Sequence, residues 1–228
     1  MEMNLSKASD FGLISYMRHT YRWMFIGLLM SFVTASLFYM SNIWMSFYTN
    51  MPLVFGAFIA EVILVLYFAS RINRMSVGAA KTVFIAYAVV NGLTLTPIMA
   101  AYEMTSLILV FAMTSVFFAT LTIYGFVTKK DLTRWGPMLL AGLVALMVFW
   151  ILSIFINLQS FEKIACVVGL LIFVGLTAYD TQKIKDMYYS MPGDENLLVK
   201  ASIFGALQLY LDFINMFLYL LRIFAKEK

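Results

Sequence analysis

Residues 23–60 read WMFIGLLMSFVTASLFYMSNIWMSFYTNMPLVFGAFIA and contain no Asp, Glu, Lys or Arg. This charge-free run of 38 residues is about twice the ~20 residues with which one helix crosses a bilayer. Pro52 lies within it, at a position where a new helix can begin. The run therefore predicts two consecutive membrane spans, at about 23–42 and 51–71.

The rest of the chain has the same character. Of its 228 residues, 63% are hydrophobic and only 12% are charged, and the mean hydropathy is +0.88. These values exclude a soluble globule and predict an all-α integral membrane bundle with no room for a soluble domain. Charges and turn formers divide the chain into seven expected spans: 23–42, 51–71, 81–102, 106–128, 135–157, 163–187 and 200–224.

The expected organisation has three parts. Residues 1–22 form an N-terminal tail with an interfacial segment, residues 23–224 form the bundle, and residues 225–228 form a short C-terminal tail. The seventh segment has Asp212 near its centre, so six spans followed by a re-entrant segment are the alternative to seven spans.

The basic residues predict the orientation of the chain. Twelve of the sixteen Lys and Arg residues fall on one side of the expected spans, which places the N-terminus in the cytoplasm by the positive-inside rule. Seven full spans would put Arg222, Lys226 and Lys228 on the opposite side. Membrane anchoring accounts for the net charge of +4, and we expect no nucleic-acid partner.

Two acidic residues fall inside apolar segments, namely Asp180 in the sixth span and Asp212 in the seventh. A charge at the centre of a membrane span costs at least ~2.5 kcal/mol on insertion scales, so each residue needs a partner or a function. The two segments are antiparallel neighbours, and their carboxyl groups can meet. Two adjacent carboxyl groups cannot both be ionised in apolar surroundings, so the pair would share a proton and sense pH. Alternatively, each Asp has its own polar partner and only fastens helices together.

Further polar groups accompany these acids. Glu61 is a third buried acid, for which Arg71 and Arg222 are candidate partners. In the last segment, polar or small residues recur at intervals of three and four and line one helix face: Gly205, Gln208, Asp212, Asn215 and Tyr219. Such a stripe fits an ion or water path, and it equally fits hydrogen bonds between helices.

The residues do not favour catalysis. A retinal-binding protein needs a lysine deep in its last helix, and no Lys lies between Ala201 and Arg222. Tyr179-Asp180 matches half of the signature of an intramembrane aspartyl protease, but the Gly-x-Gly-Asp half is missing at Asp212. The common hydrolase and phosphate-binding motifs do not occur. One cysteine, Cys166, cannot form a Cys-based metal site, and we expect a non-enzyme without a cofactor.

Several motifs together resemble the transmembrane Bax inhibitor motif family, from Arg18 onward. The most specific are Tyr179-Asp180-Thr181-Gln182-Lys183-Ile184 and Leu209-Tyr210-Leu211-Asp212-Phe213-Ile214-Asn215. Weaker ones are Arg18-His19-Thr20-Tyr21, Glu61 with Ser70-Arg71-Ile72, Tyr87 with Asn91-Gly92-Leu93-Thr94-Leu95, Tyr124-Gly125, Thr128-Lys129-Lys130-Asp131-Leu132 and Leu221-Arg222.

The resemblance implies a seven-helix bundle and a pH-sensitive calcium leak. By motif, Asp180 and Asp212 are the proton-sharing pair and transient calcium contacts, and calcium is the permeant ion. The resemblance also implies an Arg of the second helix that engages the pair, for which Arg71 is the choice and Arg74, one turn away, the alternative. Glu61 and Arg222 stand where the family carries an acidic and a basic residue.

The calcium leak is the preferred function at this point. The alternative is a non-conducting regulator that contacts other membrane proteins, and a less favoured alternative is an intramembrane aspartyl protease. The lipid bilayer, calcium and protons are the expected partners. The short tails favour a bacterial inner membrane as the location.

Overall fold

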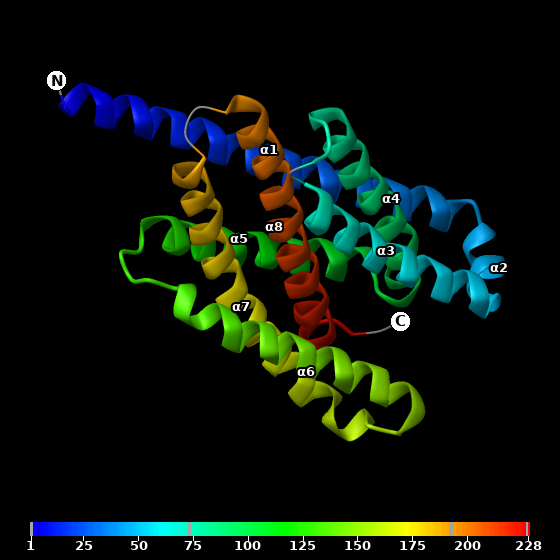
Figure 1. Ribbon diagram of the computed structural model, residues 1–228. Coiled ribbons are helices and arrows are strands. Elements are labelled where there is room, and N and C mark those ends of the chain that lie inside the picture. The colour runs from blue at the N-terminus through cyan, green and yellow to red at the C-terminus, as the bar shows by residue number, and fades with distance from the viewer. Residues whose placement is uncertain (1, 73, 192–193, 227) are drawn as a thin grey trace. The chain divides into compact units, whose positions relative to one another are not determined.

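The computed structural model describes residues 2–72, 74–191, 194–226 and 228. Every regular element in these ranges is a helix (Figure 1). The elements are α1 (Glu2–Met40), α2 (Ile43–Thr49), α3 (Met51–Arg71), α4 (Val77–Ala101), α5 (Met104–Val127), the 3-10 helix η1 (Thr133–Trp135), α6 (Gly136–Phe155), α7 (Gln159–Ser190) and α8 (Glu195–Phe224).

Seven of the described helices are long and apolar enough to cross a membrane, namely α1 and α3 to α8. This finding confirms the predicted all-α membrane bundle. The helix α8 continues without a break through Asp212 for 30 residues. At 1.5 Å per residue it is about 45 Å long and exceeds the ~30 Å hydrocarbon core. Its continuity favours seven spans over six spans and a re-entrant segment.

The first helix is longer than expected. It begins at Glu2 and runs through residue 22, where the sequence suggested a boundary between tail and bundle, and its apolar part begins at Gly12. Leu13, Tyr16 and Met17 are buried, so the amphipathic stretch before the first span continues the same helix. The division into tail and bundle at residue 22 stays a prediction. The short helix α2 was not expected, and it begins after Asn42, whose φ of 59° is in the left-handed region.

The chain divides into two compact units. The first comprises residues 1–101 and 184–210, and the second comprises residues 102–183 and 211–228. The helices α7 and α8 each contribute one part to both units.

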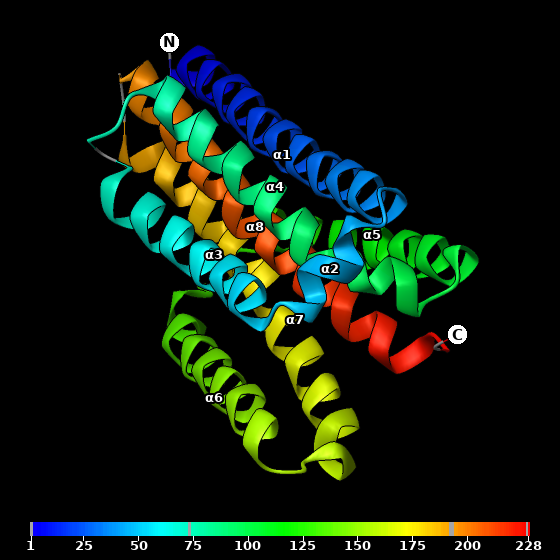
Figure 2. The ribbon, with the colours of Figure 1, turned by 90° about the vertical axis from the view of Figure 1, so that its right-hand side faces the viewer.

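In the first unit, α1 and α4 run side by side (Figure 2). Small residues permit this close approach. Gly27 of α1 faces the rings of Phe84 and Tyr210, and Gly92 of α4 faces the backbone of Ser31. These glycines lack a Cβ where a neighbouring helix already fills the space.

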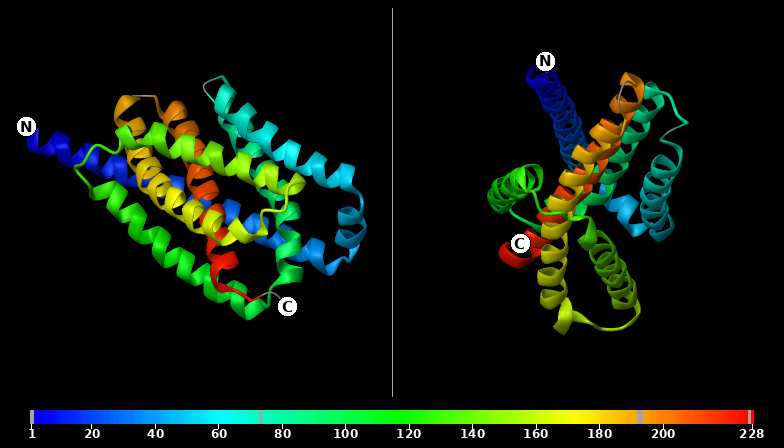
Figure 3. Two further views of the ribbon diagram at one scale, coloured as in Figure 1. Left: turned by 90° about the horizontal axis from the view of Figure 1, so that it is seen from below. Right: turned by 60° about the vertical axis from the view of Figure 1, so that its left-hand side comes forward.

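In the second unit, α6 and the first part of α7 form a hairpin joined by residues 156–158 (Figure 3). Gly175 of α7 faces Leu139, and Gly142 of α6 faces Ile172. The C-terminal part of α8 packs on α7 where the ring of Tyr219 lies against Gly169.

Substitution of Gly92 tests the close packing of α1 and α4. In Gly92→Ala the new Cβ would lie 2.6 Å from the carbonyl oxygen of Ser31, so the backbones must move apart. We expect the substitution to lower the free energy of unfolding by about 1–3 kcal/mol, as overpacking does. Thermal unfolding in detergent measures the effect.

The matched control is Gly56→Ala in α3, because a Cβ at Gly56 meets no atom within 4 Å. This variant should be as stable as the wild type or slightly more stable, since Ala favours a helix over Gly. Equal losses of stability in the two variants would contradict the packing argument.

Candidate functional site

The two aspartates singled out from the sequence both lie in the second unit. Asp180 projects from α7 and is 7% exposed, and Asp212 projects from α8 and is 3% exposed. Thr177, Ala178 and Thr181 of α7 are buried around Asp180. The hydroxyl groups of both threonines donate to carbonyl oxygens four residues earlier in the same helix. Their hydrogen-bond partners are therefore backbone groups of α7 itself.

The structure brings Asp180 and Asp212 close enough for their carboxyl groups to interact electrostatically. The Oδ2 atom of Asp212 is buried and has no hydrogen-bond partner within the described part of the chain. A buried polar atom in this state needs a proton, a cation or a water molecule as its partner. The pair can therefore bind a proton, and carboxylate oxygens are also the ligands that calcium prefers.

A third charged residue stands at this pair. The ammonium group of Lys183 attracts the carboxylates of both Asp180 and Asp212. Its Nζ also lies 5.8 Å from the centre of the Tyr179 ring. From the sequence, Lys183 was named as part of the family motif that contains Asp180, but it was given no role at the acidic pair. The available signal was the spacing of three residues between Asp180 and Lys183, which places opposite charges on one helix face.

Gln182 fastens the same part of α7 to the connection between α5 and α6. Its side chain is 8% exposed. Its Nε2 donates to the carbonyl oxygen of Lys130 at 2.9 Å, and its Oε1 accepts from the backbone N–H of Leu132 at 2.8 Å. Since both ends of the amide are used, Gln182 fixes this connection two residues away from Asp180.

The same connection contains an exposed acid, Asp131. Its carboxylate accepts hydrogen bonds from the hydroxyl group and the backbone N–H of Thr133. These bonds hold the pKa of Asp131 below its usual value. Asp131 therefore stays ionised and orders the turn into η1.

Glu61 lies in the first unit, where it belongs to a polar network between helices. Its Oε1 accepts from Asn91 Nδ2 at 3.1 Å and from Thr94 Oγ1 at 2.5 Å. The Tyr210 hydroxyl donates to Asn91 Oδ1 at 2.6 Å and lies 2.6 Å from Ser31 Oγ. The network joins α1, α3, α4 and α8. Asn91 and Thr94 were noted from the sequence, whereas Tyr210 and Ser31 were not expected to take part.

Arg71 ends α3 in the first unit and is exposed, as is Arg74 after it. The choice between these two residues as partner of the aspartates stays a prediction.

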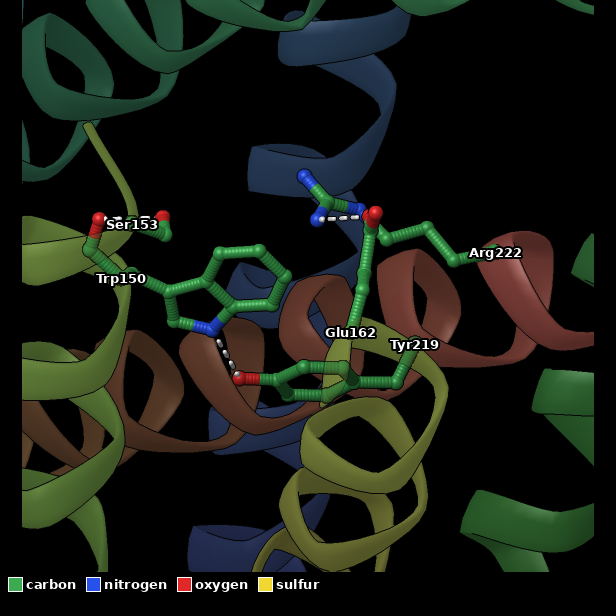
Figure 4. A network of polar contacts seen from close by, with 5 residues as sticks. All are labelled: Trp150, Ser153, Glu162, Tyr219 and Arg222. Carbon is green, nitrogen blue, oxygen red and sulfur yellow. Dashed lines mark hydrogen bonds and ion pairs between the residues drawn. The ribbon is translucent and has the colours of Figure 1, made fainter. Parts of the chain in front are cut away.

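Arg222 was considered from the sequence as a partner of Glu61. In the structure its ion pair is with Glu162 at the start of α7, with 3.3 Å between NH1 and Oε1 (Figure 4). Its guanidinium also lies 4.5 Å from the centre of the Trp150 ring. Glu162 was not foreseen because it stands near the end of an expected span, where an acid is ordinarily solvated.

Asn215 and Gln208 were also expected to make contacts between helices. The structure gives a different result for each of them. Asn215 Nδ2 donates to the carbonyl oxygen of Leu211, which belongs to the same helix. This bond to residue i−4 competes with an interhelical contact because it is always within reach. Gln208 Oε1 is buried without a hydrogen-bond partner among the described residues.

Among the described residues, no three or more His, Cys, Asp or Glu side chains form a cluster that could hold a metal ion. The Asp180–Asp212 pair offers two carboxylates. A transient calcium contact at this pair stays a prediction.

Seven apolar helices with carboxyl groups buried among them define a polytopic membrane protein with an acidic site inside its helices. Comparison with known proteins specifies this class further. The sequence model of the family described as "Inhibitor of apoptosis-promoting Bax1" matches residues 13–228. The chain therefore belongs to the Bax inhibitor family.

Relatives of the chain are found in bacteria, and two of the following three are named membrane proteins. The inner membrane protein YbhL of Escherichia coli is 37% identical over 221 residues, which cover 95% of this chain and 94% of YbhL. The protein RP147 of Rickettsia prowazekii is 34% identical, over 98% of this chain and 94% of its own length. The membrane protein SpyM3_0260 of Streptococcus pyogenes is 35% identical over 96% of both chains. The family resemblance inferred from the motifs is thereby confirmed.

Replacing Tyr210 tests the polar network of the first unit. Tyr210→Phe removes the hydroxyl group that donates to Asn91 and contacts Ser31. We expect a loss of about 1–3 kcal/mol in the free energy of unfolding, because buried polar atoms lose their partner. The control is Tyr67→Phe in α3, whose side chain is half exposed. Chemical or thermal unfolding in detergent compares the two, and a Tyr210→Phe variant as stable as Tyr67→Phe would refute the assignment.

Proposed function

We propose that the protein is a pH-sensitive calcium leak whose gate is the Asp180–Asp212 pair. The observation that carries this proposal is the buried carboxyl group of Asp212, which has an unpartnered oxygen and stands beside a second acid. Family membership supports it, because the family match over residues 13–228 includes both aspartates, and the resemblance implies that they share a proton.

The proposed mechanism depends on the number of protons at the pair. With one shared proton, the two carboxyl groups can lie together without net repulsion between two charges. When that proton leaves, two adjacent negative charges repel each other in surroundings with few compensating groups. The helices α7 and α8 then shift, and a polar path admits a hard cation that accepts oxygen ligands.

In this mechanism Lys183 supplies a fixed positive charge next to the aspartate pair. Its attraction to both carboxylates favours the deprotonated form, and this effect sets the pH at which the gate opens. Arg71 is proposed as a further partner in the closed state, by family resemblance alone.

The proposed location is a bacterial inner membrane with the N-terminus in the cytoplasm. The relative YbhL is named an inner membrane protein, and the positive-inside rule supports this orientation.

Calcium uptake into liposomes tests the gate. We expect wild-type flux to rise as the pH increases from about 5 to about 8, because deprotonation opens the path and carboxyl pairs in apolar surroundings titrate in this range. Asp180→Asn and Asp212→Asn should each lose this pH dependence, since neither variant retains two titrating carboxyl groups. Asp186→Asn, which changes an exposed acid of the same helix α7, should keep it.

Two outcomes would overturn the calcium leak. Unaltered pH dependence in both Asp variants would remove the pair from the gate. Absence of flux at every pH would leave a non-conducting regulator as the function. The family description, which names an inhibitor of a death-promoting protein, is the observation that favours this second candidate.

Lys183→Gln tests the role of the fixed charge. Without the ammonium group the deprotonated pair is less favourable, so the pH of half-maximal flux should move upward relative to the wild type. The control is Lys183→Arg, which keeps the charge and should keep this pH close to the wild-type value. If Lys183→Gln shifts the profile downward, or if both variants shift it equally, Lys183 does not act through its charge.

A further inference from the structure

A cavity lies at the end of the hairpin where α6 and α7 are connected. Along α7, this end is far from Asp180. The volume of the cavity is about 410 Å³, which falls within the range of pockets that hold small molecules. The last turns of α6, the connection and the first turn of α7 line it. Its polar and aromatic lining residues include Trp150, Ser153, Asn157, Gln159 and Glu162.

Glu162 lines the cavity, whereas Arg222 lies outside the lining and reaches the cavity through its ion pair with Glu162. The Arg222 guanidinium and the Glu162 carboxylate form an ion pair at 3.3 Å, and their side chains are 44% and 46% exposed. Each charge therefore keeps nearly half of its surface available to another ligand. A guanidinium has five N–H donors in a fork that suits phosphate oxygens, and the carboxylate can accept from an ammonium group. The pair is complementary to a zwitterion with one group of each kind.

The aromatic residues keep this pair in position. Trp150 Nε1 donates to the Tyr219 hydroxyl at 3.4 Å, and this bond orients the indole. The Arg222 guanidinium lies over the face of the Trp150 ring (Figure 4). The face of an indole attracts organic cations. The Arg222 guanidinium occupies this position beside the indole, so the ammonium of a ligand would be held by the exposed part of the Glu162 carboxylate.

The surroundings of the cavity indicate where the zwitterion comes from. Ile154, Phe155 and Ile156 line the cavity and are 66%, 80% and 54% exposed. In a membrane protein, large apolar side chains exposed at the end of a span face lipid, close to the level of the headgroups. A ligand bound here can lay acyl chains along these residues while its polar group enters the cavity.

We propose that this cavity binds a phospholipid with a phosphoethanolamine headgroup. The lipid phosphate pairs with Arg222, its ammonium pairs with Glu162 beside Trp150, and its acyl chains follow Ile154 and Phe155. The proposal does not depend on calcium conduction, because it uses other residues and another end of the helices.

Native mass spectrometry of the purified protein tests this site by titration with phosphatidylethanolamine and, separately, with phosphatidylglycerol. We expect tighter binding of phosphatidylethanolamine by the wild type. Arg222→Gln and Glu162→Gln should each weaken it on the order of threefold to tenfold, the effect of losing one partly exposed charged contact. Arg222→Lys keeps the charge and should retain most of the binding.

The matched controls are Arg134→Gln in η1 and Glu103→Gln before α5, which remove exposed charges elsewhere and should leave binding unchanged. Thermal unfolding of each variant separates loss of the ligand from loss of the fold. Equal binding of the two lipids, or equal losses in the controls, would overturn the proposal. Free ethanolamine phosphate that competes as well as the lipid would also overturn it, in favour of a soluble zwitterion.

Discussion

The absence of water from the hydrocarbon core is the constraint on which this structure depends, because each polar group there must find its partner within the protein. The backbone meets this requirement by forming long helices. Buried hydroxyl groups meet it locally: Thr114, Thr177 and Thr181 each donate to the carbonyl oxygen four residues earlier. Longer polar side chains require partners on other helices. They therefore determine which helices must be neighbours.

Two buried acids meet this requirement in different ways. The Oε1 atom of Glu61 accepts from Asn91 and Thr94, and the Tyr210 hydroxyl completes the network through Asn91. A network with several members and short bonds resists rearrangement, since breaking one bond leaves buried groups unsatisfied. Asp212 differs because Oδ2 has no hydrogen-bond partner among the described residues and a second acid is close by. A single proton or cation can therefore change the balance of forces at Asp212 more than at Glu61.

The sequence predicts the spans and the acids well, for a physical reason. Hydropathy over ~20 residues is a sum of many small contributions, so the segments 51–71 and 106–128 emerge clearly and match α3 and α5 closely. Asp180 and Asp212 emerge because a charge in an apolar run is costly. Neither argument needs knowledge of how the helices pack.

Partners at helix ends are not predictable in this way. Glu162 stands near the start of α7, where charges are ordinarily solvated, and Lys183 stands about two turns before its end. Hydropathy gives neither residue a partner, and only the folded chain joins them to Arg222 and to the aspartates. Gln182 carries no charge, and its two bonds to a connection some fifty residues earlier have no local signature. The short helix α2 is also missed, because a segment of seven residues is too short to show the periodicity of a helix face.

Two of these unpredicted residues, Gln182 and Lys183, lie close to the acidic pair along the chain. They lie two and three residues after Asp180 on α7. Gln182 bonds to the α5–α6 connection, and Lys183 attracts the acidic pair. All three side chains belong to one turn of α7. The segment 180–183 therefore joins the acidic pair and the basic α5–α6 connection through one short stretch of a single helix.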